Sequence, residues 1–501
     1  MPYTLQTLNY QNDFRRLPPA FYQSVTPLAL TQPEWVVGSD LCASLLGLDL
    51  DSLQNPESLA LLSGNKTHSQ WNPLAMKYFG HQFGYLNPDL GDGRGLLLAE
   101  VETDSGELLD LHLKGAGQTP FSRQGDGRAV LRSSIREFLC SEAMAALGIA
   151  SSRALCVVNS STSVRREEIE SGATLMRVSR SHIRFGHFEY AYHTDGNNGD
   201  NTLLNALGDY VAERHFPYIA KTPNQNADLF SLVAKKTAQM VAKWQCIGFA
   251  HGVMNTDNMS ILGETFDFGP FGFMDAFDPG YICNHSDHQG RYAFDRQPAI
   301  AHWNLSVLAQ AMSPIVEKDA LNEGLKQYSN VFNREFLSGM HEKLGLNPAA
   351  SSVDSDEQGA EFIMETLSLL KNNRLDYHYF FRVISEVNIE GGEPSALSSL
   401  RDKCIDLNSF DQWFSNYQSR LSQNTQDPNA RLAKMQAINP VYILRNHLAQ
   451  IAIDKAKHGD YSEVKRLHEV LKRPYSRQEG CQQYEALPPD WAKELEISCS
   501  S

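Results

Sequence analysis

The sequence predicts an α+β fold, in which a small lobe of strands and one helix precedes a larger, mainly helical lobe. Strand-like runs alternate with turns between Gly80 and Arg184, and helical periodicity dominates from about Asn201 onward. A polar loop directly follows the clearest helix of this second part. A cleft between two such lobes is a common place for a ligand.

Composition narrows the class of protein. The 501 residues carry 44 Lys and Arg against 59 Asp and Glu, a net charge of −15, which argues against a nucleic-acid binder. The eight cysteines form no C-x-x-C pair, as is typical of reduced, intracellular proteins. Residues 1–30 lack the apolar run of a secretory signal, and no window approaches the ~20 apolar residues of a membrane helix. We expect a cytoplasmic protein without nucleic-acid or membrane partners.

The elements of the small lobe follow from local patterns. Leu96–Glu102 is an apolar run after a glycine-rich turn, and Glu107–Lys114 alternates apolar with polar residues, so the two predict a β-hairpin. Ala129–Leu147 repeats apolar residues at helical intervals and precedes a glycine, which predicts a helix. Arg153–Val158 and Ala173–Val178 return to strand-like runs.

The second part reads as helical. Apolar residues share one face of a helix predicted over Asp228–Phe249. Residues 322–501 also read as helical, with Trp413, Tyr442 and Trp491 as expected core residues. Two polar segments, 349–359 and 390–399, read as flexible. We expect four parts: an N-terminal extension (1–79), the small lobe (80–190), the larger lobe with the catalytic and metal-binding loops (191–345), and a helical C-terminal extension packed on that lobe (346–501).

A first group of candidate site residues lies in the small lobe. Gly91 to Gly95 read Gly-Asp-Gly-Arg-Gly, and such glycines let backbone N–H groups approach a phosphate, although such a turn is more often a simple hairpin turn. The motif departs from G-x-G-x-x-G because its sixth position is Leu96. Lys114 ends the next strand and Glu137 lies in the following helix, the order in which protein kinases pair a phosphate-binding lysine with a glutamate.

A second group follows the helix over Asp228–Phe249. His251 and Asn258 keep the spacing of the kinase H-R-D-L-x-x-x-N loop, but Val253 stands where that loop has its catalytic aspartate. Asp257 is the nearest replacement carboxylate, and Asp267 opens a complete D-F-G triplet. The ordered set is more specific than any one of these motifs.

The small lobe is also rich in arginine. Arg177 and Arg184 fall in a short segment without acidic residues, and guanidinium groups bind phosphate oxygens bidentately. Together with Lys114 they could hold a polyphosphate. Arg132 and Arg136, one helical turn apart, are instead expected on a solvated helix face.

Taken together, these motifs resemble the selenoprotein O family, kinase-like proteins that act as protein adenylyltransferases. The resemblance covers most of the chain. It rests on residues 80–84, 91–94, 114–137, 177, 184, 251–258, 267–275, 283–287 and 439–446.

This resemblance implies a protein-kinase-like two-lobed fold that transfers AMP from ATP to Ser, Thr or Tyr hydroxyls of target proteins and releases pyrophosphate. By the resemblance, ATP binds in a flipped orientation, in contact with Gly91, Gly93, Arg94, Lys114, Asp126, Gly127, Arg177 and Arg184. Asp257 would accept the hydroxyl proton, and Glu137 would orient Lys114. Asn258 and Asp267 would bind Mg²⁺ or Mn²⁺.

The C-terminus differs from that of the eukaryotic members of the family. They carry selenocysteine where this chain has Cys499, so the resemblance is to a bacterial-type member. The family's redox-active C-terminal position implies a reversible disulfide between Cys499 and Cys283, and hence redox regulation.

Three other interpretations remain open at this point. Val253 in the base position would suit a pseudokinase that binds nucleotide but serves only as a scaffold. An orthodox protein kinase could use Asp257 as its base. A structural zinc could bind Cys283, His285 and His288, although this spacing matches no common zinc finger.

Overall fold

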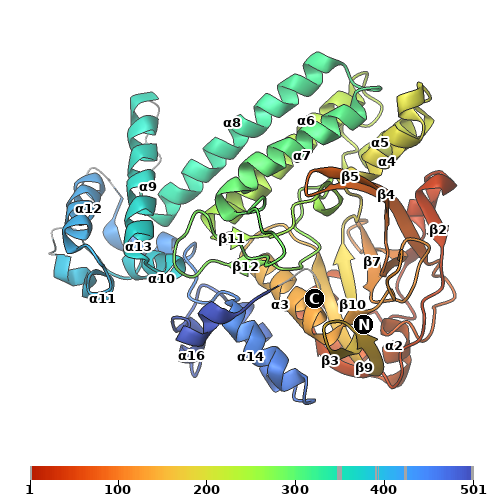
Figure 1. The fold of residues 1–501 in the computed structure, drawn as a ribbon, viewed down its shortest axis with the longest axis horizontal. Coiled ribbons are helices and arrows are strands. Elements are labelled where there is room, and N and C mark those ends of the chain that lie inside the picture. The colour runs from red at the N-terminus through yellow and green to blue at the C-terminus, as the bar shows by residue number, and fades with distance from the viewer. Residues whose placement is uncertain (1–2, 347–352, 390–391, 393, 423–425, 498–501) are drawn as a thin grey trace.

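A ten-stranded antiparallel sheet dominates the first 180 residues (Figure 1), so the predicted α+β class is confirmed. The structure, a computed structural model, describes residues 3–346, 353–389, 392, 394–422 and 426–497. The main path of the sheet runs in the order β2 (Tyr22–Ser24), β4 (Leu74–Gln82), β6 (Gly95–Glu102), β7 (Leu108–Lys114), β10 (Ile169–Ser179), β9 (Arg153–Arg165) and β3 (Glu34–Gly38). The remaining strands β1 (Tyr10–Gln11), β5 (Tyr85–Gly91) and β8 (Ala129–Val130) pair with β6, β4 and β10.

The predicted hairpin is confirmed and sets the register of the sheet. β6 and β7 pair so that Gly95 lies opposite Lys114. On the other side of β7, Leu175 of β10 lies opposite Lys114, and Arg177 lies opposite His112. Because side chains alternate along a strand, Lys114 and Arg177 project from the same face of the sheet.

The predicted helix of the small lobe is α3 (Leu131–Ala146), which packs on β9 and β10. The expectation of solvated arginines on it was wrong. Arg136 is buried, and its Nη2 donates to the Phe271 carbonyl at 3.0 Å. Arg132 forms an ion pair with Glu170 at 2.9 Å. Both side chains thus hold α3 to neighbouring segments that lie far away in the sequence.

Long helices form the second part, as predicted. α4 (Phe185–Thr194) and α5 (Thr202–His215) lead to α6 (Gln225–Cys246), which packs against α7 (Gln297–Met312) and α8 (Lys318–Lys343). Between α6 and α7 the chain is mostly loop, with one small two-stranded sheet of β11 (Phe249–Ala250) and β12 (Gly272–Phe273). Among the helices of the described ranges, none is both long and apolar enough to cross a membrane.

The C-terminal residues are helical, in agreement with the sequence pattern. One group of helices lies far from the sheet (Figure 1). It comprises α9 (Val353–Asn373), α10 (Tyr377–Ile384), α11 (Ser398–Arg401), α12 (Leu407–Leu421) and α13 (Pro428–Gln436). The chain then returns through α14 (Asn446–Ala456), α15 (Ser462–Leu471) and α16 (Gln482–Glu485), and both α14 and α15 pack on α3.

Several local expectations about this part need correction. Trp413 and Tyr442 are buried as expected, but Trp491 is 43% exposed and was wrongly placed in the core. Residues 349–352 of the first polar segment lie outside the described residues, whereas 353–359 begin α9 and are not a loop. In the second segment, residues 390, 391 and 393 lie outside the description, and a 3-10 helix occupies Pro394–Leu397.

The division into four parts remains a prediction, and two observations bear on its boundaries. β4 runs across residue 79, and the residues before it supply β1, β2, β3 and the short helices α1 (Asp40–Leu45) and α2 (Pro56–Leu62). All three of the strands before β4 belong to the large sheet. The contacts of α14 and α15 with α3 also join the C-terminal part to the small lobe, and not only to the larger one.

A buried lysine at the end of α8 generates a testable prediction. Lys343 donates to the amide oxygen of Asn439 at 2.8 Å and lies over the rings of Tyr377 and Phe381, and burial lowers its pKa to about 7. The ammonium form is therefore disfavoured in the folded state, so stability should rise with pH above about 7 until the unfolded-state pKa near 10.5 is reached.

We expect the free energy of unfolding of the unmodified protein to increase between pH 7 and 9 relative to that of Lys343→Met, by at most roughly 1.4 kcal/mol per pH unit. Urea denaturation at several pH values measures this difference. Lys326→Met, at an exposed position on the same helix, is the control and should run parallel to the unmodified protein. A Lys343→Met curve that also runs parallel would contradict the prediction.

Candidate functional site

A cleft of about 660 Å³ lies between the sheet and the loops that follow α6. It brings together segments that are up to 192 positions apart in the sequence, from Tyr78 of β4 to Pro270 just after the D-F-G triplet. The predicted nucleotide, metal and catalytic residues all line it: Gly91, Gly93, Arg94, Lys114, Asp126, Gly127, Arg177, Arg184, Asp257, Asn258 and Asp267. Glu137 lies behind this wall, on α3.

Two carboxylates fix three of the cations that line the cleft. Glu137 is 1% exposed and accepts from Lys114 Nζ through one oxygen and from Arg177 Nε, at 2.5 Å, through the other. Arg177 Nη2 also reaches Asp267 Oδ1 at 2.8 Å, and Arg184 Nη1 reaches Asp267 Oδ2 at 2.6 Å. The predicted Lys114–Glu137 contact is therefore present, as part of a continuous chain of five charges.

The surroundings of these five charged side chains shift their pKa values. Burial lowers the pKa of Lys114 to about 8, although Glu137 opposes the change. Burial alone would raise the pKa of Asp267, but Arg177 and Arg184 outweigh it and hold that pKa far below the usual range. Asp267 also has a φ of 57°, in the left-handed region that costs a non-glycine residue energy and persists only where contacts enforce it.

Asp257 lies in a 3-10 turn, Thr256–Asn258, directly beside the strand β4. Its Oδ2 accepts from Gln82 Nε2 at 3.3 Å, whereas Oδ1 is buried without a hydrogen-bond partner among the described residues. A Cβ at Gly80 would lie 2.5 Å from Oδ1, so only glycine fits there without displacement. Burial raises the pKa of Asp257 to about 7, a value suited to a group that takes up a proton.

Sequence reasoning did not assign a role to Gln82 or to the backbone that surrounds it. The N–H of His81 donates to Thr256 Oγ1 at 2.7 Å, and that of Phe83 donates to Tyr292 Oη at 3.0 Å. The first contact attaches the β4–β5 hairpin directly to the loop that carries Asp257, and the second does so through Tyr292, whose Oη donates to Asn255 Oδ1 at 2.6 Å. In the sequence, the run Gly80-His81-Gln82-Phe83-Gly84 indicates only the family resemblance, because the Gln82 contact spans 175 positions.

The neighbouring Asn258 is oriented by the backbone. Its Nδ2 donates to the Val253 carbonyl at 3.1 Å, so Oδ1 is the end of the amide that could bind a cation. His251, at the start of the same loop, is buried, and its ring Nε2 lies 3.0 Å from the Phe266 carbonyl, next to the D-F-G triplet.

The glycine-rich turn, residues 91–95, is fixed by contacts of Asp92 with two neighbouring strands. The buried Asp92 accepts from Met76 N at 3.1 Å and lies 3.2 Å from His112 Nε2. Gly127 has a φ of +69°, and a Cβ there would lie 2.1 Å from the backbone of Gly117, so a side chain would collide. Asp126 is exposed, and Arg166 binds both of its oxygens, at 2.8 and 3.0 Å, a partner that the sequence did not reveal.

The two predicted redox cysteines can be placed only in part. Cys283 is buried, with its Sγ 3.4 Å from the Ala250 carbonyl that accepts its hydrogen bond. Cys499 lies outside the described residues, but the carbonyl of Ile497 accepts from His285 N at 2.8 Å. The zinc interpretation gains no support, because the only three-donor cluster within metal-binding distance in the described ranges is Asp40, His468 and Glu469. Lys472 Nζ already binds both carboxylates of that cluster.

Comparison with known proteins identifies the chain. A family model described as protein adenylyltransferase SelO matches residues 4–472. A protein nucleotidyltransferase YdiU of Pseudomonas aeruginosa is 49% identical over 498 residues, which cover 99% of this chain and 100% of the relative. Proteins of the same name from Pseudomonas fluorescens and Stutzerimonas stutzeri are each 50% identical, over 99% of this chain and 99% and 100% of their own lengths.

These relatives define the class: the chain is an enzyme, a nucleotidyltransferase. It belongs to the protein adenylyltransferase SelO family, so the resemblance found in the sequence is confirmed.

The shared carboxylate of Glu137 yields a prediction about stability. Glu137→Gln leaves Lys114 and Arg177 buried without their common counter-charge, and breaking a buried ion pair in this way costs about 3–5 kcal/mol. We expect a loss of this order in the free energy of unfolding, measured by urea denaturation at pH 7.

The matched control is Glu57→Gln. Glu57 pairs with Lys66 at 3.0 Å, and both side chains are more than half exposed, so its loss should cost less than about 1 kcal/mol. Equal, small losses in the two variants would show that Glu137 does not hold the cations of the cleft.

Proposed function

We propose that the protein transfers AMP from ATP to Ser, Thr or Tyr hydroxyls of target proteins and releases pyrophosphate. The observation that supports this proposal best is the placement of Lys114, Arg177 and Arg184, three buried cations joined to two carboxylates in one wall of the cleft. The family description, protein adenylyltransferase, agrees with it.

Charge placement favours one orientation of the nucleotide. The β- and γ-phosphates carry most of the charge of ATP, and the cations of this wall would attract that end of the molecule. The α-phosphate would then lie toward Asp257, which adjoins the same wall because Arg184 Nη1 donates to its backbone carbonyl at 2.8 Å.

The chemical step follows from this orientation. The hydroxyl oxygen of the target attacks the α-phosphorus, the bond from that phosphorus to the pyrophosphate oxygen breaks, and the hydroxyl proton passes to the Asp257 carboxylate. Cations on the leaving group stabilise the negative charge that grows on pyrophosphate as the bond breaks. Gln82 holds Oδ2 of Asp257, so Oδ1 is the oxygen without a competing partner among the described residues.

A divalent cation fits the residues predicted for it. Asn258 offers an amide oxygen and Asp267 a carboxylate, the hard oxygen donors that Mg²⁺ prefers and Mn²⁺ accepts. When bound, such an ion would neutralise phosphate charge. Within the protein itself, Arg177 and Arg184 fix the position of the Asp267 carboxylate before any ligand arrives.

We also propose that the fold is two-lobed in the manner of protein kinases. Lys114, paired with Glu137 of a helix, lines the cleft from the sheet-containing part, and the loop with the D-F-G triplet lines it from the helical part. This division would make the cleft a boundary between lobes.

Isotope transfer tests the proposed reaction. With magnesium and ATP, we expect label to pass to protein hydroxyls from α-labelled ATP and not from γ-labelled ATP. Asp257→Ala should lower this transfer by at least about 100-fold, the range of general-base catalysis, whereas Asp295→Asn at an exposed position should leave it unchanged. Transfer of the γ-label instead would indicate an orthodox kinase, and transfer of neither label to varied protein targets would favour a pseudokinase scaffold.

We further propose that Cys283 and Cys499 form a reversible disulfide. The contact between His285 and Ile497 brings the described end of the tail to the loop that carries Cys283. Treatment with hydrogen peroxide would remove one proton and one electron from each thiol, and in the reducing cytoplasm the bond should form only under oxidative conditions. Peptide mapping of the oxidised protein should find a peptide pair linked through Cys283 and Cys499. The pair should persist in the control Cys404→Ser and be absent in Cys499→Ser. Finding both thiols unlinked after oxidation would refute the proposed disulfide.

A further inference from the structure

A second cavity, of about 470 Å³, lies apart from the cleft. Its walls come from the N-terminal segment, the turn between β6 and β7, the end of β10, and the helices α5 and α6. Its size falls within the roughly 300–1,000 Å³ of small-ligand sites. Nothing in the proposed transfer reaction uses it.

Basic side chains converge on this cavity. Arg16, Arg180, Arg214 and Lys236 all line it. Lys236 lies 5.8 Å from the ring of Phe216, and no carboxylate of the described residues forms an ion pair with it. Its pKa is lowered by burial and by the nearby charge of Arg180, although Glu264 opposes the change.

Arg180 and Arg214 keep donors available on the same side. The side-chain hydrogen bond of Arg180 runs from Nε to Glu264 at 2.5 Å, which leaves both terminal nitrogens without a hydrogen-bonded partner in the described ranges. Arg214 is 4% exposed, and its Nε is buried without a partner there. The next residue, His215, likewise has a buried Nε2 without a partner among the described residues.

Two of the three acidic residues that line the cavity form ion pairs with an arginine. Asp13 and Glu213 both accept from Arg16, at 3.2 and 2.6 Å. Glu107 lies in the exposed turn between β6 and β7. Lys236 is thus the one lysine or arginine of the cavity for which the described residues supply no ion pair, and Arg180, although paired with Glu264, keeps its terminal nitrogens for a ligand.

An aromatic surface adjoins these cations. Phe216 is buried, and Tyr218 is 69% exposed, with the two ring centroids 6.4 Å apart. An exposed aromatic ring beside cations that still have free N–H donors suits a ligand that combines an anionic group with a planar ring.

We propose that this cavity binds a small phosphate-bearing anion, with the phosphate at Lys236 and Arg180 and any attached ring against Tyr218. Free phosphate and a nucleoside monophosphate share this chemistry. The inference goes beyond the proposed transfer reaction and does not depend on it.

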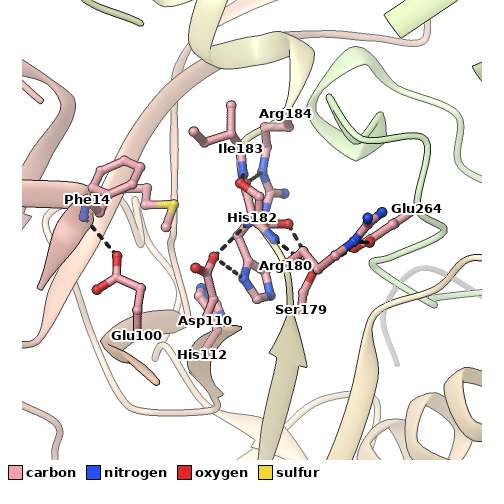
Figure 2. A network of polar contacts seen from close by, with 12 residues as sticks. Phe14, Glu100, Asp110, His112, Ser179, Arg180, His182, Ile183, Arg184 and Glu264 are labelled. Carbon is pink, nitrogen blue, oxygen red and sulfur yellow. Dashed lines mark hydrogen bonds and ion pairs between the residues drawn. The ribbon is translucent and has the colours of Figure 1, made fainter. Parts of the chain in front are cut away.

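A continuous set of buried polar contacts connects this cavity to the nucleotide cleft. Arg214 Nη2 donates to Asp110 Oδ1 at 2.6 Å, and Asp110 Oδ2 lies 3.0 Å from His182 Nδ1. The His182 ring stacks on that of His112 at 4.4 Å, and His112 contacts Asp92 of the glycine turn. Figure 2 shows Asp110 beside His182, with Arg184 of the cleft above His182 and the Arg180–Glu264 pair on the side of His182 away from Asp110.

The two sites are also connected by a short stretch of sequence. Arg177 and Arg184 line the cleft, while Arg180, between them in the sequence, lines the second cavity and accepts from Arg214 Nη2 through its carbonyl at 3.2 Å. A ligand that shifts Arg180 or Arg214 thus acts on the segment that positions the cleft arginines. Binding in the second cavity should therefore change the affinity of the cleft for ATP.

Calorimetry on the full-length protein tests the site. With the cleft filled by a non-hydrolysable ATP analogue and magnesium, AMP, inorganic phosphate and adenosine are titrated separately. We expect saturable binding of AMP that weakens at least 10-fold in Lys236→Met and in Arg180→Met. Lys235→Met, an exposed neighbour on α6, should bind like the unmodified protein, and adenosine should not bind.

The arms of the experiment separate the alternatives. Phosphate binding as tight as AMP binding would identify free phosphate as the ligand, and weaker phosphate binding would identify a nucleotide that also uses Tyr218. Absence of saturable binding by both, or binding unaffected by Lys236→Met and Arg180→Met, would overturn the proposal. The affinity for the ATP analogue, measured with and without saturating AMP, should differ severalfold; equal values would overturn the connection between the sites.

Discussion

The pairing of buried charges is the constraint on which the site depends. Glu137 can be buried only because Lys114 and Arg177 both bind it, since an isolated carboxylate in such surroundings would be far too costly. Each partner comes from a different element: Glu137 from α3, Lys114 from β7, and Arg177 from β10. Charge compensation thus fixes how the helix sits on the sheet, in addition to apolar packing.

The same constraint extends into the helical part of the molecule. Asp267 forms ion pairs with both Arg177 and Arg184, and its backbone adopts an unfavourable conformation that these contacts enforce. Arg184 in turn donates to the carbonyl of Asp257. The orientation of the D-F-G triplet and of the loop with Asp257 is therefore set by cations that belong to the sheet side. A ligand with several phosphates would meet a surface whose positive groups are already in place, which reduces the entropy lost on binding.

How much could be predicted depended on how far apart in the sequence the interacting residues lie. The hairpin of β6 and β7 and the helices α3 and α6 have strong local periodicity, and the order of Lys114 and Glu137 in successive elements was enough to predict their contact. By contrast, β1 has two residues and no readable pattern, although it joins the sheet. Gln82 and Arg166 contact site residues across long separations that no local rule encodes. The burial of Arg136 could not be predicted for the same reason. Its position one helical turn from Arg132 does not indicate the contact with Phe271, which is distant in the sequence.

The packing of α14 and α15 on α3 has a consequence for the order in which the chain can fold during synthesis. One large apolar cluster contains Phe138 of α3, Leu448 of α14 and Val464 of α15. The strands of the sheet and α3 leave the ribosome first, but this face of α3 stays uncovered until more than 460 residues have been made. At elongation rates of roughly 5–20 residues per second, an apolar surface is then exposed for many seconds. The nascent chain therefore has a long period in which binding by a chaperone competes with aggregation.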